Sequence, residues 1–420
     1  MPDHRVAAGL SESDSSVHVV LGSPLYRGAT IAMFLSGVGM SAAAPQIASF
    51  LVNELHASLA VAGLYYLTNL TAPIAGFIIG SRSDRTGGRL NLFRLCAVIA
   101  FVGWLIVAAS TALWVPFAVS AVVLGFGGGA GSQLFAAIND EITTHPLPNS
   151  DGVVNIVRMA LTAGWVVGPV AGSFLAAAAG PRVMFCATAI CFLVQIVPLG
   201  RLKDAHRPAS GTASVITGFQ QPAPASPGLR AMLPLLGFTL LYVCVYAGES
   251  SKYAYLPIYM NEGLRLDSTL SGSVIGIQPL IELALMPVAI VASRRIGIVP
   301  LMTVGAIFGV GANLLFALSG NVVGLFAGQI LMGGVWGIWA TLGIIVAQRL
   351  LPSAVATASA VFMSSAAVSS ALGGLMGGLA AEWIGLPRLF LVPATLALVA
   401  VVGLVTMSRR SSVGAPSPRE

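Results

Sequence analysis

Charged residues are scarce in this chain of 420 residues. Asp, Glu, Lys and Arg make up only 9% of the sequence, whereas 56% of the residues are hydrophobic. A soluble domain carries roughly a quarter charged residues, so this composition excludes an ordinary soluble protein. The formal net charge of +6 reflects where the basic residues lie, as described below, and does not indicate nucleic-acid binding. The composition indicates an integral membrane protein in contact with the lipid bilayer.

Lysine is the rarest charged residue, with two copies, Lys203 and Lys252. Neither lysine follows a glycine, so the chain lacks a phosphate-binding loop of the Walker type, which excludes ATP-driven transport by this chain alone. The sequence also lacks a nucleophile elbow and a cluster of metal ligands. We therefore expect no enzymatic activity, no cofactor and no metal.

Cysteine is also rare. All four cysteines fall in strongly apolar stretches, where they behave as small apolar side chains and indicate neither a disulfide framework nor a metal site. They are Cys96, Cys186, Cys191 and Cys244.

Long apolar stretches dominate the rest of the sequence. Each is long enough to cross a bilayer as a helix, which takes roughly 20 residues, and none shows the alternation of a transmembrane barrel strand. The fold class predicted is an all-α membrane protein with twelve transmembrane helices. The predicted spans are 27–51, 58–80, 90–111, 113–138, 153–178, 181–200, 231–260, 269–293, 298–319, 321–347, 353–379 and 384–407.

Polar segments divide this sequence into two halves. We expect 1–25 to be a disordered cytoplasmic tail and not a signal peptide, and 408–420 to be a second cytoplasmic tail. Residues 201–229, rich in Pro, Ser and Ala, predict a cytoplasmic linker between six-helix halves at 26–200 and 230–407. Most of the 21 basic residues lie on the side of both termini, which predicts a multi-pass protein of the cytoplasmic (inner) membrane with both ends inside.

The loop after the second span carries the first recognisable motif. It reads Gly80-Ser-Arg-Ser-Asp84-Arg85-Thr-Gly87-Gly88-Arg89, and it resembles the loop signature of the major facilitator superfamily, except at Gly88, where a basic residue is usual. The resemblance implies the fold of that superfamily and a conformational role for the loop, in which Asp84 pairs in one state and separates in another. A basic loop that only sets topology is the alternative.

The fifth span carries a second motif, Gly164 to Gly172, with glycines four residues apart. Such a stripe lets a neighbouring helix approach closely, and Pro169 is expected to loosen the helix. Gly168-Pro169 resembles the Gly-Pro motif of the exporter branches of the superfamily. We therefore add Gly168 and Pro169 to the conformational candidates.

Glu282 is the deepest charged residue of the predicted spans. It has about a dozen residues on either side in its span, on the order of 18 Å of helix, and so lies near the bilayer centre. Charged groups there are costly and usually functional. Glu282 has three interpretations. It accepts and releases the proton of a proton-coupled carrier, or it accepts hydrogen bonds from sugar hydroxyls. In the third interpretation it is protonated, or paired with Lys252, and only holds two helices together.

Glu249 and Lys252 lie three residues apart on the seventh span and can neutralise each other. Tyr246, in the same tyrosine-rich stretch, offers a ring and a hydroxyl for a substrate. In the first half, polar side chains within or near spans give further candidates for substrate or proton binding. These are Gln46, Asn69, Gln133 and Arg158, and Arg158 has the alternative of pairing with Asp140 or Glu141.

Several short motifs narrow the resemblance. Arg82-Ser83-Asp84, Gln133-Leu134-Phe135-Ala136, Arg158 and Glu282 are similar to the sugar efflux transporter family of the superfamily. The resemblance implies proton-driven export of sugars or glycosides, with Gln133, Arg158 and Glu282 carried over by position. An exporter of drugs or other metabolites with the same fold is the alternative, and a membrane receptor without transport activity is a third hypothesis.

Overall fold

The structure, a computed structural model, describes residues 16–145, 150–202 and 229–410. Within these ranges every regular element is a helix, and twelve helical segments are long and apolar enough to cross a membrane. This confirms the twelve predicted spans, and most of their ends shift by only a few residues. The observed segments are Pro24–Asn53, Leu59–Ser83, Arg89–Ala109, Trp114–Thr144, Gly152–Ala179, Pro181–Leu199, Arg230–Gly263, Ser268–Ile296, Ile298–Leu318, Val322–Leu350, Thr357–Ile384 and Arg388–Ser408.

Packing divides the chain into two compact units. Unit 1 comprises Met1–Ala43 and Thr71–Gly218, and unit 2 comprises Ala44–Leu70 and Phe219–Glu420. The outer part of the first helical hairpin, 44–70, therefore packs with the second half of the sequence. The predicted linker 201–229 and the predicted tails 1–25 and 408–420 lie largely outside the described residues, so the domain division made from the sequence stays a prediction.

Unit 1 is a bundle around α2. This helix packs against α10 and α11, while α6 packs against α9 and α11. A buried cluster of apolar side chains that includes Met33, Phe93 and Leu134 fills the space between them. The helices of unit 1 are α2 (Pro24–Ala43), α5 (Ala72–Thr86), α6 (Arg89–Ala109), α7 (Trp114–Val119), α8 (Gly125–Gly127), α9 (Gly129–Thr144), α10 (Ser150–Ala179) and α11 (Pro181–Val194).

The glycine stripe on α10 explains its close packing against α2. A side-chain carbon at Gly164, Gly168 or Gly172 would collide with α2, as the spacing of four residues predicts. Pro169 lies inside α10, which continues as one helix on both sides of it. The stripe therefore shapes the contact between two helices whose sequences are more than a hundred residues apart.

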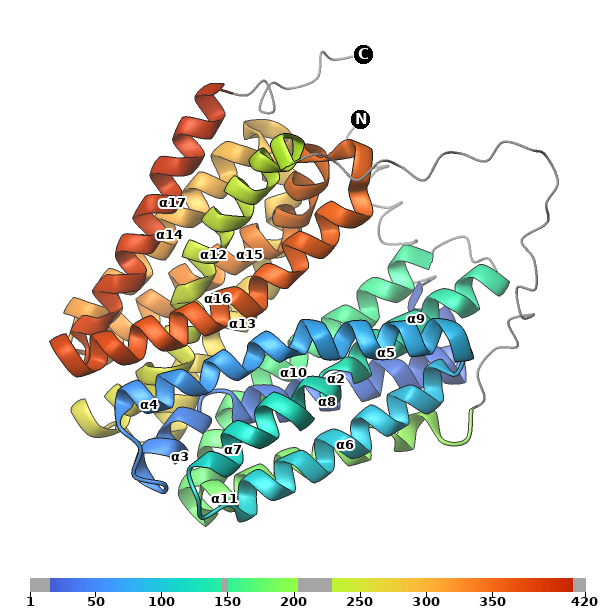
Figure 1. The fold of residues 1–420 in the computed structure, drawn as a ribbon, viewed down its shortest axis with the longest axis horizontal. Coiled ribbons are helices and arrows are strands. Elements are labelled where there is room, and N and C mark those ends of the chain that lie inside the picture. The colour runs from blue at the N-terminus through green and yellow to red at the C-terminus, as the bar shows by residue number, and fades with distance from the viewer. Residues whose placement is uncertain (1–15, 146–149, 203–228, 411–420) are drawn as a thin grey trace. The chain divides into compact units, whose positions relative to one another are not determined.

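Unit 2 holds the remaining spans. In it α12 packs against α16 and α17, α13 packs against α15, and α14 lies between α15 and α17 (Figure 1). The short helix α4 packs against α16. The helices of unit 2 are α3 (Ile47–Asn53), α4 (Leu59–Leu64), α12 (Leu229–Ile258), α13 (Ser268–Ile296), α14 (Ile298–Leu318), α15 (Val322–Leu350), α16 (Val355–Ile384) and α17 (Leu391–Arg410).

Polar side chains close several helix ends, as the exposed N–H groups of a first turn require. Asp267 accepts a hydrogen bond from the backbone N–H of Leu270 at the start of α13 (2.9 Å), and Asn321 accepts one from Gly324 at the start of α15 (2.9 Å). Arg182 donates to the carbonyl oxygens of Ala108 (2.9 Å) and Ser110 (2.7 Å) at the end of α6. These contacts fix the loops that join the spans.

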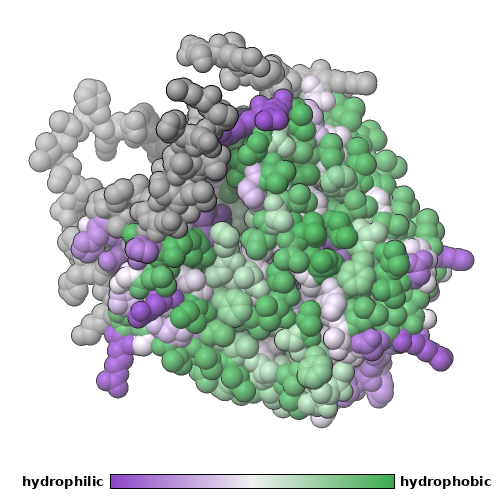
Figure 2. Space-filling view, turned by 180° about the vertical axis from the view of Figure 1, so that it is seen from behind, coloured by the Kyte–Doolittle hydropathy of each residue, from purple (hydrophilic) through white to green (hydrophobic). Residues whose placement is uncertain are grey.

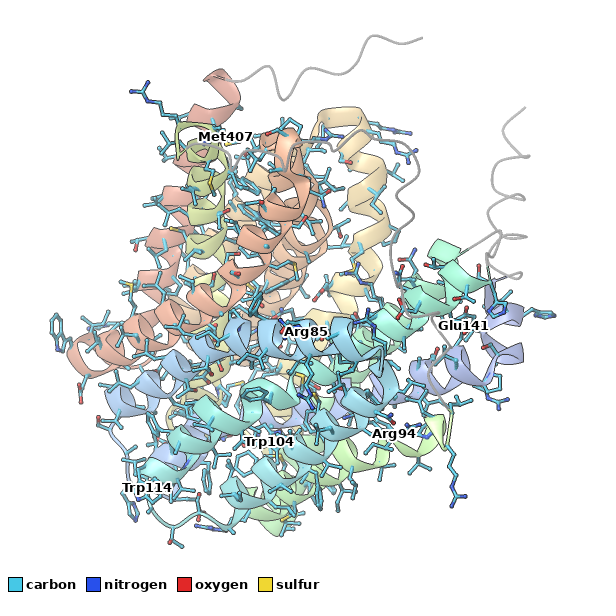
Figure 3. The ribbon with its side chains drawn as sticks, turned by 45° about the vertical axis from the view of Figure 1, so that its right-hand side comes forward. Arg85, Arg94, Trp104, Trp114, Glu141 and Met407 are labelled. Carbon is cyan, nitrogen blue, oxygen red and sulfur yellow. The ribbon has the colours of Figure 1, made fainter. Side chains whose placement is uncertain are left out.

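The surface suits a lipid environment. Hydrophobic residues cover most of the described surface on the face shown in Figure 2, and large apolar side chains such as Phe77 (77% exposed) and Val323 (78%) point outward. In unit 1, Arg94 and Glu141 lie toward one end of the bundle and the exposed Trp114 toward the other (Figure 3). Tryptophan favours membrane interfaces, so the outward apolar surface and the polar ends are those of a multi-pass membrane protein.

Candidate transport site

A buried ion pair lies at the centre of the candidate site in unit 2. Lys252 is completely buried, and its Nζ lies 2.8 Å from Oε1 of Glu249, which is 7% exposed. The two residues are three apart on α12, so they share a face of the helix. The ammonium also lies 4.1 Å from the ring centre of Tyr253. The sequence-based expectation that Glu249 and Lys252 neutralise each other matches this geometry.

Gln278 completes the ion pair from the neighbouring helix α13. Its Nε2 donates to Oε1 of Glu249 (2.9 Å), and its Oε1 accepts a hydrogen bond from Nζ of Lys252. A glutamine amide has both a donor and an acceptor, so one side chain contacts both charges. Within the described part of the chain, Oε2 of Glu249 has no hydrogen-bond partner. The sequence analysis missed Gln278, although its position four residues before Glu282 is a usable signal.

Glu282 lies midway along α13 and one helical turn from Gln278. Residues four apart on a helix share a face, so Glu282 faces the same part of α12 as Gln278 does. It is partly exposed, and its charge interacts with those of Glu249 and Lys252. The charges of Glu249, Lys252 and Glu282 therefore act on one another, but the ion pair joins Lys252 to Glu249, and the role of Glu282 stays a prediction.

Glycines on the surrounding helices allow this arrangement. A side chain at Gly333 or Gly337 of α15 would meet the backbone oxygens of Gln278 and Glu282, so α15 and α13 approach closely at the site. On the other side, Ser251 of α12 donates a hydrogen bond to the carbonyl oxygen of Gly373 in α16 (2.8 Å). These close contacts hold the backbones that carry the three charged residues.

An aromatic cluster adjoins the charged residues. Tyr246 lies edge-on to Trp336 (4.4 Å between ring centres) and stacks with Tyr242 (5.4 Å). Together with Trp339 and two valines, these side chains line a small cavity of about 10 Å³. The charges of Glu249 and Glu282 act on Tyr242 and Tyr246, so the charged groups lie near the aromatic cluster. The sequence analysis named Tyr246 for this role.

Two candidate binding residues from the first half of the sequence, Asn69 and Gln46, belong to unit 2, and their contacts differ from those of the charged residues. Asn69 donates a hydrogen bond to Oγ of Ser370 on α16 (2.7 Å). Gln46 lies in the turn between α2 and α3, where it precedes the first turn of α3. Both residues lie where the first hairpin packs with the second half of the sequence.

Gln133 and Arg158 belong to unit 1. Gln133 is buried on α9 and accepts a hydrogen bond from Oγ of Ser83. Arg158 is exposed on α10. Of its expected partners, Asp140 pairs with Arg89, and Glu141 pairs with His145 (3.2 Å).

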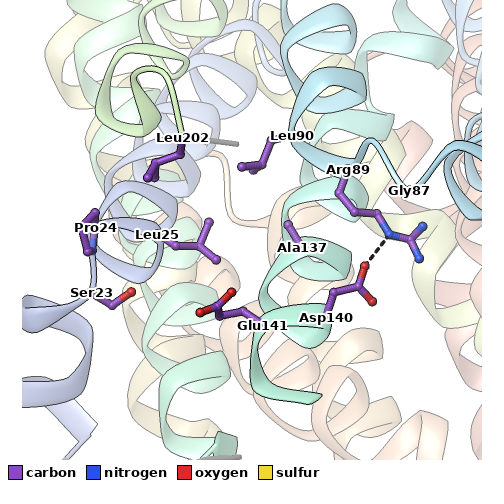
Figure 4. A pocket seen from close by; sticks show the side chains of 10 residues that line it. All are labelled: Ser23, Pro24, Leu25, Gly87, Arg89, Leu90, Ala137, Asp140, Glu141 and Leu202. Atoms are coloured by element: carbon purple, nitrogen blue, oxygen red, sulfur yellow. Dashed lines mark hydrogen bonds and ion pairs between the residues drawn. The ribbon is translucent and has the colours of Figure 1, made fainter. Parts of the chain in front are cut away.

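The loop motif forms a second polar network in unit 1. Arg89, the first residue of α6, donates to Asp140 of α9 (2.9 Å) and to Ser83 of α5 (2.7 Å). Ser83 in turn donates to Gln133. A pocket opens beside the ion pair and is lined by ten residues that include Glu141 and Leu202 (Figure 4). The sequence analysis missed Ser83 and Asp140 as members of this network.

The glycines of the motif have different surroundings. Gly87 ends α5 with φ of +66°, and its N–H donates to the carbonyl oxygen of Ser83 (2.9 Å). This left-handed conformation favours glycine. Gly80 has open space around it, and Arg85 is exposed on α5. The Asp84 side chain lies outside the described residues, so its pairing stays a prediction.

Comparison with known proteins decides the family. The sequence model of the Major Facilitator Superfamily matches residues 29–363 and 238–420. The chain belongs to the Major Facilitator Superfamily. This confirms the resemblance stated from the loop motif, and it assigns the chain to a family of membrane transporters, not of enzymes.

Curated relatives and solved structures agree with this assignment. A protein named putative sugar efflux transporter from Deinococcus radiodurans is 24% identical over 92% of this chain and 99% of its own length. Sugar efflux transporter B of Salmonella typhimurium is 24% identical over 84% and 88%. The crystal structure of the nucleoside transporter NupG superposes with a TM-score of 0.72 at 16% identity, over 92% of this chain and 98% of that one. The fold is therefore that of this superfamily.

Proposed function

We propose that this protein is a secondary transporter that exports sugars or glycosides across the cytoplasmic membrane, by proton antiport with alternating access. The names of the curated sugar efflux relatives support the direction and the substrate class. Most basic residues lie on the predicted side of both termini, and this supports an orientation with both termini in the cytoplasm. In this orientation α12 begins, and α13 ends, at the cytoplasmic side.

The site in unit 2 supports this function most strongly. The aromatic rings of Tyr242, Tyr246 and Trp336 offer flat surfaces to the apolar faces of a sugar ring, and carboxylate and amide groups offer partners for its hydroxyls. Glu282 is the proposed proton carrier, because a partly exposed carboxyl within a span can exchange a proton with whichever side of the membrane its surroundings open to. Glu249, Lys252 and Gln278 are proposed to bind substrate next to it.

Two features of unit 1, the polar network of Arg89 and the glycine contact between α10 and α2, are proposed to serve the conformational change. Arg89 and Asp140 form an ion pair between α6 and α9, and such pairs can differ between the states of a transporter. Gly168 and Pro169 are proposed to let α10 shift against α2. Gln46, Asn69, Gln133 and Arg158 remain candidates for contact with substrate or with moving helices.

An exporter of apolar drugs or metabolites is the second candidate. The mostly aromatic and aliphatic lining of the cavity beside Trp339 favours it, because such a lining also accepts lipophilic molecules.

Counterflow in proteoliposomes tests the proposed function. The purified protein is reconstituted in vesicles loaded with unlabelled lactose or glucose, and uptake of the labelled sugar is measured. We expect uptake well above that of protein-free vesicles, and competition by other sugars. Absence of sugar exchange, together with exchange of a lipophilic cation such as tetraphenylphosphonium, would replace the sugar proposal by the drug-export alternative.

A further inference from the structure

The negative and positive charges of the unit 2 site are unequal in number. Two carboxyl groups, Glu249 and Glu282, interact with a single ammonium, Lys252. The neighbouring helices supply no further charge at this depth: α14 has no ionisable side chain, α15 has only Arg349 in its last turn, and α16 has only the exposed Glu382 near its end. The other titratable groups that interact with Glu282 are hydroxyls, those of Tyr242, Tyr246 and Tyr253.

The hydrogen bonds decide which carboxylate holds the ammonium. Nζ of Lys252 lies 2.8 Å from Glu249 and also donates to Gln278. Gln278 donates to the same oxygen of Glu249 (2.9 Å). The pair is therefore neutral without Glu282. An ionised Glu282 would leave one uncompensated negative charge beside this buried pair, and such a charge is costly inside a membrane span.

We propose that Glu249, Lys252 and Glu282 form one unit that holds a single exchangeable proton, located on Glu282 while Gln278 keeps Lys252 paired with Glu249. The proposal deepens the proposed function and rests on it for its consequence, an exchange of one proton for each substrate molecule. On release, the O–H bond of the Glu282 carboxyl breaks and its proton passes to water, and the three residues then carry one net negative charge, with Lys252 as the only cation among them. Gln278 acts as a positioning residue in this scheme.

The charge count makes different predictions for different substitutions. Glu282→Gln leaves a neutral pair that needs no proton. Lys252→Met leaves two carboxyl groups without a cation, so the neutral site needs two protons. Lys252→Arg keeps the cation, so the neutral site still needs one proton. Glu382→Gln is the matched control, because Glu382 is an exposed carboxylate at the end of α16.

Infrared spectroscopy of the purified, reconstituted protein counts these protons directly, without any transport. Protonated carboxyl groups give a C=O stretching band that shifts in heavy water. At neutral pH we expect the band in the wild type, in Lys252→Arg and in Glu382→Gln. We expect its loss in Glu282→Gln and about twice its intensity in Lys252→Met. Thermal melting establishes that each variant is folded.

Two results would overturn the proposal: an unchanged band in folded Glu282→Gln, or no band in the wild type. The lysine variants add an independent check, since Lys252→Arg must restore the intensity that Lys252→Met changes. The measurement is separate from the test of the proposed function. A failure of sugar counterflow would reject sugar transport. The number of protons held by the site would still be decided by the infrared C=O band.

Discussion

Lys252 has no exposed surface, yet its charge is compensated from two helices. Glu249 lies on the same face of α12, and Gln278 reaches it from α13. Hydrogen bonds to charged groups contribute about 1.5–3 kcal/mol, and removing one partner leaves a buried charge poorly solvated. Stability and transport therefore depend on the same three side chains at this point of the structure.

We expect Gln278→Leu to destabilise the protein by roughly 1–3 kcal/mol, because both Lys252 and Glu249 lose a hydrogen-bond partner. Unfolding in detergent solution, followed by circular dichroism, measures the loss. The control is Gln348→Leu, since Gln348 is partly buried and donates a hydrogen bond to the neutral hydroxyl of Ser359 (3.0 Å). Equal effects of the two substitutions would show that the charged pair does not depend on Gln278.

Glycine positions control how the helices of each unit approach. Gly168 on α10 lies against Ser41 and the backbone of α2, whereas Gly76 on α5 has open space around the position of a side chain. The two glycines have the same intrinsic cost in a helix, about 1 kcal/mol relative to alanine. Only packing distinguishes them, so they form a matched pair for testing the α2–α10 contact.

We expect Gly168→Ala to lower the melting temperature and Gly76→Ala to leave it unchanged or raise it. The added methyl group at Gly168 forces α10 away from α2, and such overpacking costs typically about 1–3 kcal/mol. Thermal melting of the two variants in detergent, alongside the wild type, gives the comparison. A Gly168→Ala variant as stable as the wild type would mean that α10 and α2 separate without cost.

At the scale of the whole molecule, composition and hydropathy were sufficient to predict the fold class and all twelve spans, because a helix that crosses lipid must be apolar over its full length. The fourth span shows the limit: it was predicted to end at residue 138, but it continues to Thr144. Its last turns carry Asp140, which pairs with Arg89. A polar helix end held by tertiary contacts has no hydropathy signal.

The candidate site was predictable only in part. Glu282, Glu249 and Lys252 are isolated charges in apolar spans, and this signal is visible in the sequence. The contacts of Gln278 are not visible, because they depend on the rotation of α13 against α12, which close packing against α15 sets. The grouping of 44–70 with unit 2 likewise depends on tertiary packing, which span hydropathy does not encode.

Sugar accumulation driven by a pH gradient is the measurement that tests the central claim most directly. In proteoliposomes with an imposed gradient, the wild type and the control Glu382→Gln should accumulate labelled sugar against its concentration gradient. Folded Glu282→Gln should accumulate none, because the proposed proton carrier on α13 is then absent. Gradient-driven accumulation by Glu282→Gln at the wild-type level would contradict the account.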